Sequence, residues 1–314
     1  MAITGTDINQ AAAVLKAGGL VAIPTETVYG LAANAFDGQA VLKVFTAKNR
    51  PSFDPLITHI ARPEALAPLV THIPATAQAL IDTFWPGPLT LVLPRSAKIS
   101  DLVSSGLDTA AFRMPRHPLL QALLTRLDFP LVAPSANPFG YVSPTSAAHV
   151  SHQLGNKIDY ILDGGPSKIG VESTIVRCTG RQPEVLRLGG LAVEDIEAAI
   201  GKVAINTASG SRPSAPGMLL THYAPAKELL LGNIEELLGE NPQRKIGILS
   251  FRKKYPGYPN FVLSAQGSLT EAASNLFAGL RWFEQQDVEL IITEKVPDTG
   301  LGRAINDRLN RASR

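Results

Sequence analysis

The sequence predicts an α/β protein built from a mixed sheet and a second, smaller α/β unit. Three observations carry this prediction. Apolar strand-like runs alternate with helical periodicity, these runs outnumber the helices that would connect them as parallel strands, and a segment rich in Ser, Pro, Gly and Ala interrupts the pattern after residue 205. At about 150 residues per domain, 314 residues suffice for two domains.

The chain opens with a helix followed by a buried strand. Asp7 is placed to cap a helix that runs to Lys16, and two glycines at 18–19 end it. The apolar run 20–23 then predicts a strand that Pro24 terminates. A helix followed by a strand is a typical beginning of an α/β unit.

The same alternation continues through the first two-thirds of the chain. Helices are predicted at residues 41–47 and 75–84. Extended runs are predicted at residues 55–60, 89–93, 110–114, 131–133, 160–162, 173–177 and 185–188. Because the last two runs follow each other with no helix between them, we expect a mixed sheet, not a purely parallel one.

Residues 206–226 have the composition of a linker. The stretch also contains apolar and aromatic residues that a plain spacer does not need, namely Met218, Leu219, Leu220, His222 and Tyr223. We therefore expect part of it to lie on the first domain. The predicted organisation is a first domain at 1–205, a linker at 206–226 and a second domain at 227–314.

The second domain is predicted to be a compact α/β repeat. Strands are expected at 245–251 and 288–293, with helices at 269–286 and 301–311. On the last helix we expect the charged side chains to face outward, these being Arg303, Asp307, Arg308 and Arg311.

Composition excludes several classes of protein. Twenty-nine Lys and Arg against 27 Asp and Glu give a net charge of +2, too small to attract nucleic acid or an anionic membrane by bulk field. The single cysteine, Cys178, excludes intramolecular disulfides and zinc sites built from paired thiolates. The first residues lack the features of a secretion signal, and no apolar run approaches the ~20 residues of a membrane span. We expect a cytoplasmic protein with no membrane partner.

Motifs for nucleotides and metals are also missing. The chain has no P-loop, and Gly300 and Gly302 do not follow a strand as a dinucleotide motif requires. Its six histidines lack metal-ligand spacing, so a protein-built metal site is not expected.

Polar residues instead gather just after several predicted strands, where α/β sheets place their ligands. One group follows the strand at 20–23 and offers the hydroxyls of Thr25, Thr27 and Tyr29 before a glycine turn. Taken alone, it is more typical of an ordinary strand-to-loop turn.

Two cations, Lys48 and Arg50, follow the second predicted helix. In extended backbone, residues two apart face the same side, so both side chains could hold one polyphosphate. The alternative is a helix C-terminus whose cations interact with its own dipole.

Two further candidates lie in apolar strands. His59 ends the run 55–60, where a lone histidine is more often a hydrogen-bonded core residue than a ligand. Arg113 lies in the run 110–114, and a buried guanidinium must find an anion because leaving it unpaired is very costly. A carboxylate ligand would meet that need beside the loop 133–137.

The last group is glycine-rich. Residues 164–167 and 170–174 let backbone N–H groups approach an anion, and Arg187 follows, although such turns are common in loops.

Together the groups describe a pocket with fixed cations, many hydroxyls and few candidate bases. This favours phosphoryl or nucleotidyl transfer over acyl hydrolysis, and no Gly-x-Ser-x-Gly motif argues otherwise.

Five short motifs in the first two-thirds of the chain resemble those of the YrdC-like family. The resemblance rests on IPTETVYGL at 23–31, KNRP at 48–51, PLITHI at 55–60, PSAN at 134–137 and ESTI at 172–175. The segments SAPGM at 214–218 and THYAP at 221–225 resemble the junction of its two-domain members, the threonylcarbamoyl-AMP synthases. The likeness spans essentially the whole chain, with weaker motifs beyond residue 223.

The resemblance implies a fold and an activity. The fold is an open, twisted mixed sheet with a concave basic face, followed by a small Rossmann-like domain. The activity is nucleotidyl transfer that joins L-threonine, bicarbonate and ATP into L-threonylcarbamoyladenylate and pyrophosphate. Downstream tRNA threonylcarbamoyl-transfer proteins would use the product to modify the adenosine beside a tRNA anticodon.

The resemblance also implies roles for individual residues. Lys48 and Arg50 would be catalytic. Five residues would bind L-threonine: Thr27, His59, Arg113, Ala133 and Ser173. Eight would bind ATP: Lys48, Arg50, Asp54, Thr109, Ser135, Ser143, Arg187 and Tyr223. Mg²⁺ would enter with ATP and keep several waters, without a protein cage. Tyr223 would close over the nucleotide, which makes the linker a lid.

One position departs from the family pattern. Relatives commonly carry asparagine before Pro-Leu-Ile, whereas this chain has Asp54. The carboxylate could contact the nucleotide or Mg²⁺, or pair with Lys48 or Arg50.

Two other functions stay open from the residues. A non-catalytic RNA-binding module would use the basic surface, and weak RNA binding is compatible with it, but the charge of +2 and the lack of an aromatic row disfavour this. Another carbamoyl-transfer enzyme on the same sheet is disfavoured by the lack of cysteine-rich zinc segments.

Overall fold

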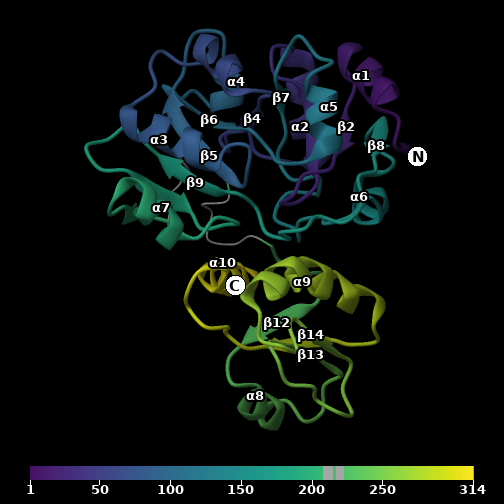
Figure 1. The fold of residues 1–314 in the computed structure, drawn as a ribbon. Helices are drawn as coiled ribbons and strands as arrows, with labels where there is room; N and C mark the ends of the chain where they lie inside the picture. Colours follow the sequence, from purple (N-terminus) through teal and green to yellow (C-terminus); the bar gives the residue numbers. More distant parts are fainter. Residues whose placement is uncertain (208–214, 217–222, 314) are drawn as a thin grey trace.

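The fold consists of two sheets that follow one another along the chain (Figure 1). It is seen in a computed structural model that describes residues 1–207, 215–216 and 223–313. The first sheet has eleven strands and the second has four. We refer to residues 1–207 as the N-terminal part and to residues 223–313 as the C-terminal part.

The large sheet is mixed, as the sequence predicts. Its strands, in spatial order, are β1 (Ile3–Gly5), β8 (Tyr160–Leu162), β2 (Val21–Ile23), β3 (Gly30–Asn34), β7 (Leu131–Val132), β4 (Ile57–His59), β6 (Thr109–Arg113), β5 (Leu89–Pro94), β9 (Thr174–Arg177), β10 (Glu184–Arg187) and β11 (Ala204–Ile205). Strand β4 pairs with β6 in parallel, whereas β5 pairs with β6 and β10 with β9 in antiparallel fashion. Strands β1, β3 and β11 lie where the sequence predicts no strand.

Eight helical segments accompany the large sheet in the described residues. They are α1 (Ile8–Lys16), α2 (Gly38–Lys48), the 3₁₀ helix η1 (Pro63–Leu69), α3 (Ala75–Phe84), α4 (Asp101–Ser104), α5 (Pro118–Leu124), α6 (Ala147–Leu154) and α7 (Val193–Ile200). The cap predicted for α1 is present, because the carboxylate of Asp7 accepts hydrogen bonds from the backbone N–H groups of Asn9 and Gln10. α3 has the predicted bounds.

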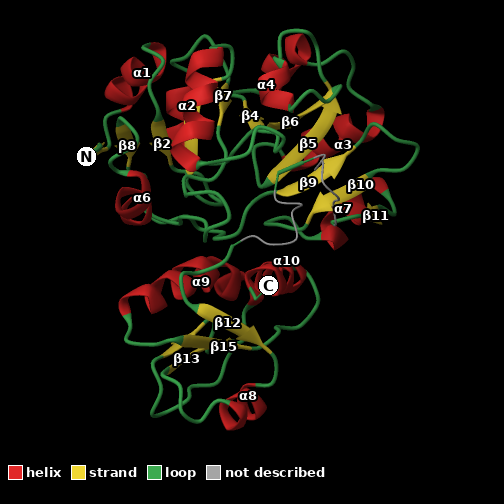
Figure 2. Cartoon of the chain, turned by 180° about the vertical axis from the view of Figure 1, so that it is seen from behind, coloured by secondary structure: helices red, strands yellow, loops and turns green. Residues whose placement is uncertain are grey.

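The C-terminal part is a small parallel sheet with helices on both faces. Its strands, in spatial order, are β12 (Glu228–Leu231), β15 (Leu290–Thr293), β13 (Ile246–Ser250) and β14 (Asn260–Val262). Its helices are α8 (Ile234–Glu240), α9 (Leu269–Trp282), the 3₁₀ helix η2 (Phe283–Gln285) and α10 (Leu301–Ala312). Figures 1 and 2 show α9 and α10 on the side that faces the N-terminal part and α8 on the opposite side. None of the helices that the structure describes has the length and apolar character needed to cross a bilayer.

The outward orientation expected for the charged residues of α10 is wrong for two of them. Arg308 and Arg311 are buried. α10 turns its charged face toward the N-terminal part, where Arg308 donates to the carbonyl of Leu188 and Arg311 to that of Thr207. The amphipathic pattern identifies the polar face of the helix, but it does not show whether another part of the chain covers that face.

The two parts are joined by an apolar contact. One hydrophobic cluster contains Phe277 and Leu280 of α9 together with Val28, Val142 and Val171 of the N-terminal part. A cluster that draws on both parts removes apolar surface of both from water, which favours a fixed arrangement.

We expect Gly170→Ala to weaken this docking. Gly170 has φ +78, and a Cβ built there would lie 2.5 Å from the carbonyl oxygen of Ala273 and from Cα of Ser274 in α9. The control is Gly165→Ala, because Gly165 has a similar φ of +79 with nothing within 4 Å. The backbone cost is about 1–2 kcal/mol in both variants, and the clash adds about 1–3 kcal/mol at residue 170 alone. Urea unfolding measures the difference, and equal losses would contradict it.

Candidate active site

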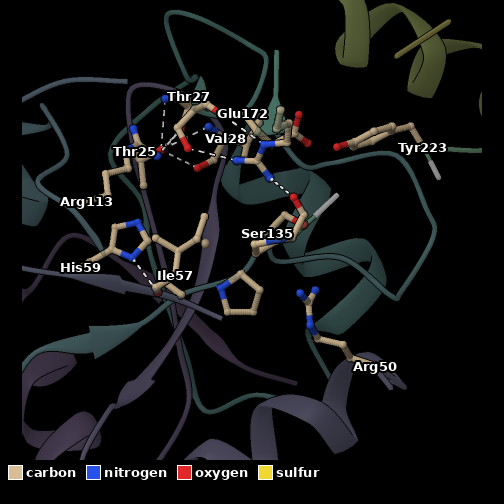
Figure 3. Close-up of a pocket in the computed structure, with 16 residues that line it drawn as sticks. Thr25, Thr27, Val28, Arg50, Ile57, His59, Arg113, Ser135, Glu172 and Tyr223 are labelled. Atoms are coloured by element: carbon tan, nitrogen blue, oxygen red, sulfur yellow. Dashed lines mark hydrogen bonds between the residues drawn. The ribbon is translucent and has the colours of Figure 1, made fainter. Parts of the chain in front are cut away.

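A pocket opens where the central strands of the large sheet end (Figure 3). Its empty space, including the part open to solvent, is about 550 Å³. Strands β4, β6 and β10 supply His59, Arg113 and Arg187. The pocket lies at a strand end of an α/β sheet, as the sequence predicts for the polar groups.

Most of the predicted site residues line this pocket. All five predicted L-threonine residues do: Thr27, His59, Arg113, Ala133 and Ser173. Of the eight predicted ATP residues, four do: Arg50, Ser135, Arg187 and Tyr223. Figure 3 shows His59 and Arg113 together at one end and Tyr223 at the opposite side, with Arg50 entering from a third direction.

Four predicted residues do not line the pocket. Lys48 and Asp54 are buried behind its wall, and the hydroxyl of Ser143 donates to Glu172 at 2.5 Å. Thr109 begins β6, four residues before Arg113, so it lies at the far end of that strand.

Strand register explains why His59, Arg113 and Ser173 meet. His59 on β4 lies opposite Arg113 on β6, and Thr90 on β5 lies opposite Arg113 from the other side. The hydroxyl of Ser173, just before β9, is 2.7 Å from that of Thr90. Four neighbouring strands thus bring these polar groups to one level of the sheet.

Arg113 already has a carboxylate partner within the chain. Its Nη2 atom lies 2.8 Å from Oε1 of Glu26, and both side chains are buried. Its Nη1 donates to the hydroxyl of Thr27 at 2.8 Å, and its Nε to the carbonyl of Gly87. Each terminal nitrogen keeps a second N–H beyond these contacts. Glu26 therefore meets the need for an anion that the sequence assigns to a ligand, and it fixes the guanidinium with donors to spare.

His59 is a neutral hydrogen-bond acceptor toward the pocket. Burial, followed by the charge of Arg113, lowers the pKa of His59 to about 3, against a smaller opposing effect of the Ile57 carbonyl. The Nδ1 atom lies 3.2 Å from that carbonyl, which can only accept, so Nδ1 carries the proton. The lone pair is then on Nε2, and the ring can accept a hydrogen bond from a ligand.

Lys48 and Arg50 do not lie side by side on extended backbone, so that expectation is wrong. α2 continues to Lys48, and Asn49 ends it with a left-handed φ of +52. The side chains then diverge, with the Lys48 ammonium donating to the carbonyls of Ser135 and Asn137. Lys48 thus fixes the loop that follows β7.

Arg50 pairs with Asp54. Its Nη2 is 2.9 Å from Oδ2 of Asp54 and also donates to the carbonyl of Pro55. Of the roles left open for Asp54, the structure therefore has the ion pair with Arg50. Burial raises the pKa of Asp54, while Arg50 and then Lys48 oppose the shift.

Arg187 differs from Arg50 and Arg113 in its partners. Its Nε and Nη2 donate to the carbonyl and hydroxyl of Ser173, both at 3.0 Å, and its Nη1 donates to the carbonyl of Pro216 at 3.3 Å. These acceptors are neutral, and no carboxylate in the described part of the chain forms an ion pair with it. Its charge is available to an anion in the pocket.

Part of the predicted linker contacts the sheet. Ala215 is buried in an apolar cluster with Ile57, Ala111 and Leu186, and Pro216 contacts Arg187. This agrees with the expectation that the linker lies partly on the first domain. Met218, Leu219, Leu220 and His222, which also supported that expectation, lie outside the described residues.

Sequence reasoning missed the role of Glu172. This buried carboxylate lines the pocket, where its Oε1 accepts from Ser143 and its Oε2 from Nε of Arg308 at 2.9 Å. Burial alone would raise the pKa of Glu172, but Arg308, then Arg187 and the Ser143 hydroxyl, together lower it. In the sequence, only the position of Glu172 between the glycine-rich turns and β9 could have indicated its role. No sequence feature indicates that Arg308 on α10 is its partner.

The pocket does not contain a protein cage for a metal. Within the residues described, no three His, Cys, Asp or Glu side chains are grouped to hold an ion. Three buried carboxylates are each paired with an arginine: Glu172, which lines the pocket, and Glu26 and Asp54, whose partners Arg113 and Arg50 line it.

Comparison with known proteins decides the family. Residues 13–189 match the Sua5/YciO/YrdC family model, which is described as "Telomere recombination". Residues 191–314 match the model described as "Threonylcarbamoyl-AMP synthase, C-terminal domain". The chain belongs to the Sua5/YciO/YrdC family. This bears out the resemblance seen in the motifs.

Members of the Sua5/YciO/YrdC family cover nearly the whole chain. The threonylcarbamoyl-AMP synthase of Bacillus subtilis is 44% identical over 98% of this chain and 92% of its own length. The threonylcarbamoyl-AMP synthase of Schizosaccharomyces pombe is 37% identical over 93% of this chain and 84% of its own length. The crystal structure of P. abyssi Sua5 complexed with L-threonine superposes with a TM-score of 0.94 at 42% identity, over 100% of this chain and 97% of that one. This match also bears out the two-part α/β fold.

We expect His59 to make the protein less stable in acid. Its folded-state pKa of about 3 lies below the ordinary value of 6.5, so the unfolded chain takes up the proton first as the pH falls. The contribution is complete above pH 6.5 and is lost progressively between pH 6.5 and 3. At pH 5 the loss amounts to roughly 2 kcal/mol.

Urea unfolding of the wild type and His59→Asn at pH 7 and pH 5 measures this loss. The variant keeps His149 and His117, whose pKa values burial also lowers, so the difference between the two proteins isolates His59. Identical losses on acidification would show that the imidazole is not held neutral.

Proposed function

We propose that this chain is a threonylcarbamoyl-AMP synthase, which joins L-threonine, bicarbonate and ATP into L-threonylcarbamoyladenylate and releases pyrophosphate. One observation carries the proposal: a single pocket is lined by Arg113, His59 and Thr27 and also by Arg187 and Tyr223. Figure 3 shows Tyr223 on the opposite side from Arg113 and His59, and Arg187 is an electrostatic neighbour of Tyr223. The end with Arg113 has the groups that recognise an amino acid, and the end with Arg187 has a cation available for phosphate. Membership of the family and the names of its full-length relatives support the same reaction.

L-threonine binds, in this proposal, at the end that contains Arg113. The two remaining N–H groups of its guanidinium form a fork for the substrate carboxylate. The neutral His59 accepts from the amino group or hydroxyl through Nε2. Glu26 and Thr27 hold the guanidinium in orientation, so little side-chain freedom is lost on binding.

The reaction then needs orientation more than a strong base. The threonine amine adds to the carbon of bicarbonate with loss of water, which gives a carbamate. A carbamate oxygen attacks the α-phosphorus of ATP, the bond to the bridging oxygen breaks, and pyrophosphate leaves with that electron pair. Fixed positive charge near the phosphates stabilises the negative charge that develops on the leaving group.

ATP occupies the end that contains Arg187. The charge of this side chain is not balanced by an ion pair within the described residues, so it can bind a phosphate oxygen without first breaking one. Ser135 lies on the loop that Lys48 fixes, and Arg50 enters from below it. We assign Lys48 and Arg50 the role of holding this wall of the triphosphate site.

Magnesium enters as part of the MgATP substrate. Because the carboxylates at the pocket are paired with arginines, its ligands are phosphate and water oxygens. Thr109 and Ser143 do not line the pocket, so we assign them indirect roles. Ser143 acts through the hydrogen bond that it donates to Glu172.

We assign residues 1–205 to the catalytic domain, residues 206–226 to a linker and residues 227–314 to a C-terminal domain. Of the linker, Tyr223 lines the pocket, which supports a role for it at the nucleotide end. The product is a mixed anhydride, which is an activated acyl donor. A downstream tRNA-modifying protein therefore consumes it, and we assign both steps to the cytoplasm.

The reaction itself is tested by product detection. We expect pyrophosphate release to require both L-threonine and bicarbonate, together with a threonine-dependent adenylate in the mass spectrum. Omission of either substrate should reduce release at least tenfold. Release that proceeds equally without threonine would exclude the assigned reaction.

The two ends of the pocket are tested by a pair of variants. Arg113→Lys keeps the charge but lacks the planar fork, so L-threonine should bind 10–100-fold more weakly, about 1.4–2.7 kcal/mol, with ATP binding little changed. Arg187→Met should weaken ATP by a similar factor and weaken L-threonine less, because it removes the donors to Ser173 but leaves the Arg113 fork in place. Equilibrium dialysis of each substrate separates the effects, and parallel losses of both ligands in either variant would contradict the assignment.

A further inference from the structure

Arg308 belongs to the C-terminal part, yet its side chain contacts the wall of the pocket. It is 0 % exposed. Its Nε donates to Oε2 of Glu172 at 2.9 Å, and its Nη2 donates to the carbonyl of Leu188 at 2.8 Å. Its Nη1 donates to Asp307 at 2.6 Å. The guanidinium carbon also lies 4.8 Å from the ring centre of Tyr223.

The ring of Tyr223 contacts two helices of the C-terminal part. It stacks on Phe277 of α9 with centroids 5.5 Å apart, and Arg308 of α10 lies over it. The backbone at Tyr223 is left-handed, with φ +67, a conformation that persists in a non-glycine residue only when its surroundings fix it. The side chain that lines the nucleotide end is therefore placed by α9 and α10.

Glu172 presents an electrostatic problem at the same end. A buried carboxylate beside a site for a triphosphate repels the ligand unless a cation offsets it. Arg187 is close enough to influence Glu172 but forms no ion pair with it. Arg308 supplies the ion pair, and the charge of Arg187 stays available to the ligand.

We propose that Arg308 is a positioning residue of the nucleotide end of the pocket: by pairing with Glu172 and holding the ring of Tyr223, it keeps Arg187 free to bind the phosphates of ATP. The inference deepens the proposed function and rests on it for the identity of the ligand. L-threonine binding is independent of Arg308, because Arg113 has its own partner in Glu26.

The primary test is Arg308→Met, which keeps the length of the side chain and removes its charge. Glu172 is then left to attract Arg187. We expect ATP to bind at least tenfold more weakly, with L-threonine binding changed less than twofold. Equilibrium dialysis measures each ligand alone, so the result does not depend on turnover.

A rescue experiment tests whether the unpaired charge of Glu172 causes the loss of ATP affinity. In the double variant Arg308→Met/Glu172→Gln, the unpaired carboxylate is removed, and ATP affinity should return to within threefold of the wild type. A merely structural role of Arg308 gives no such recovery. ATP affinity that stays as low in the double variant as in Arg308→Met would overturn the proposal.

A matched control lies on the same helix. Arg303 reaches across the same contact to Glu194 at 3.5 Å, but both side chains are partly exposed. Arg303→Met should bind both ligands as the wild type does. If it weakens ATP as much as Arg308→Met does, the effect comes from general loss of docking and the proposal is wrong.

A second variant covers the case in which Arg308→Met does not fold. Arg308→Lys keeps the charge but cannot reach Glu172, the Leu188 carbonyl and the Tyr223 ring together. ATP should then weaken at least threefold and threonine remain unchanged. Unchanged ATP affinity in Arg308→Lys would refute the positioning role in that case.

The outcomes also separate this inference from the proposed function. A wild type that binds ATP and threonine but forms no adenylate refutes the reaction, while the Arg308 comparison can still be read from binding. A wild type that forms the adenylate, with ATP affinity unaffected by Arg308→Met, refutes the inference alone. A wild type that binds no ATP overturns both.

Discussion

The pocket depends on keeping several buried guanidinium groups compensated without neutralising all of them. Breaking a buried ion pair by removing one partner costs about 3–5 kcal/mol, so each arginine at this site needs an internal partner before any ligand arrives. Arg113 has Glu26, and Arg50 has Asp54. Arg187 is satisfied by the carbonyls of Ser173 and Pro216 and by the Ser173 hydroxyl, which complete its hydrogen bonds but leave its charge. This distinction determines where an anion is bound most favourably.

The mixed sheet makes such an arrangement attainable. Register places His59 and Arg113 on neighbouring strands, and the antiparallel return of β10 brings Arg187 beside Ser173. A purely parallel sheet would need a crossover connection before each of these strands, and β9 and β10 have only a short turn between them. Lys48 adds a further constraint from behind, since its ammonium fixes the loop after β7 through two carbonyls.

Sequence patterns predicted the strand ends better than the contacts made there. His59, Arg113 and Ser173 were identifiable because polar residues in or beside apolar runs are conspicuous, and the motifs supported them. The pairing of Arg113 with Glu26 could not be identified from the sequence, because these side chains are 87 positions apart and meet only in the folded sheet. Local backbone overturned the expectation for Lys48 and Arg50, since one left-handed residue, Asn49, separates their directions. The burial of Arg308 was out of reach because periodicity marks the polar face of α10 but does not show what covers it.

The C-terminal part consequently has more than a supporting role in the architecture of the pocket. A domain attached only by a linker would leave the pocket wall unchanged when it moves. Here the wall includes Tyr223, whose ring contacts Phe277 and Arg308. It also includes Glu172, whose carboxylate accepts a hydrogen bond from the same arginine. Separation of the two parts would therefore expose an apolar cluster and leave a buried carboxylate without its ion pair at the same time. Both costs oppose separation, which makes the docked arrangement the one in which this wall of the pocket is complete.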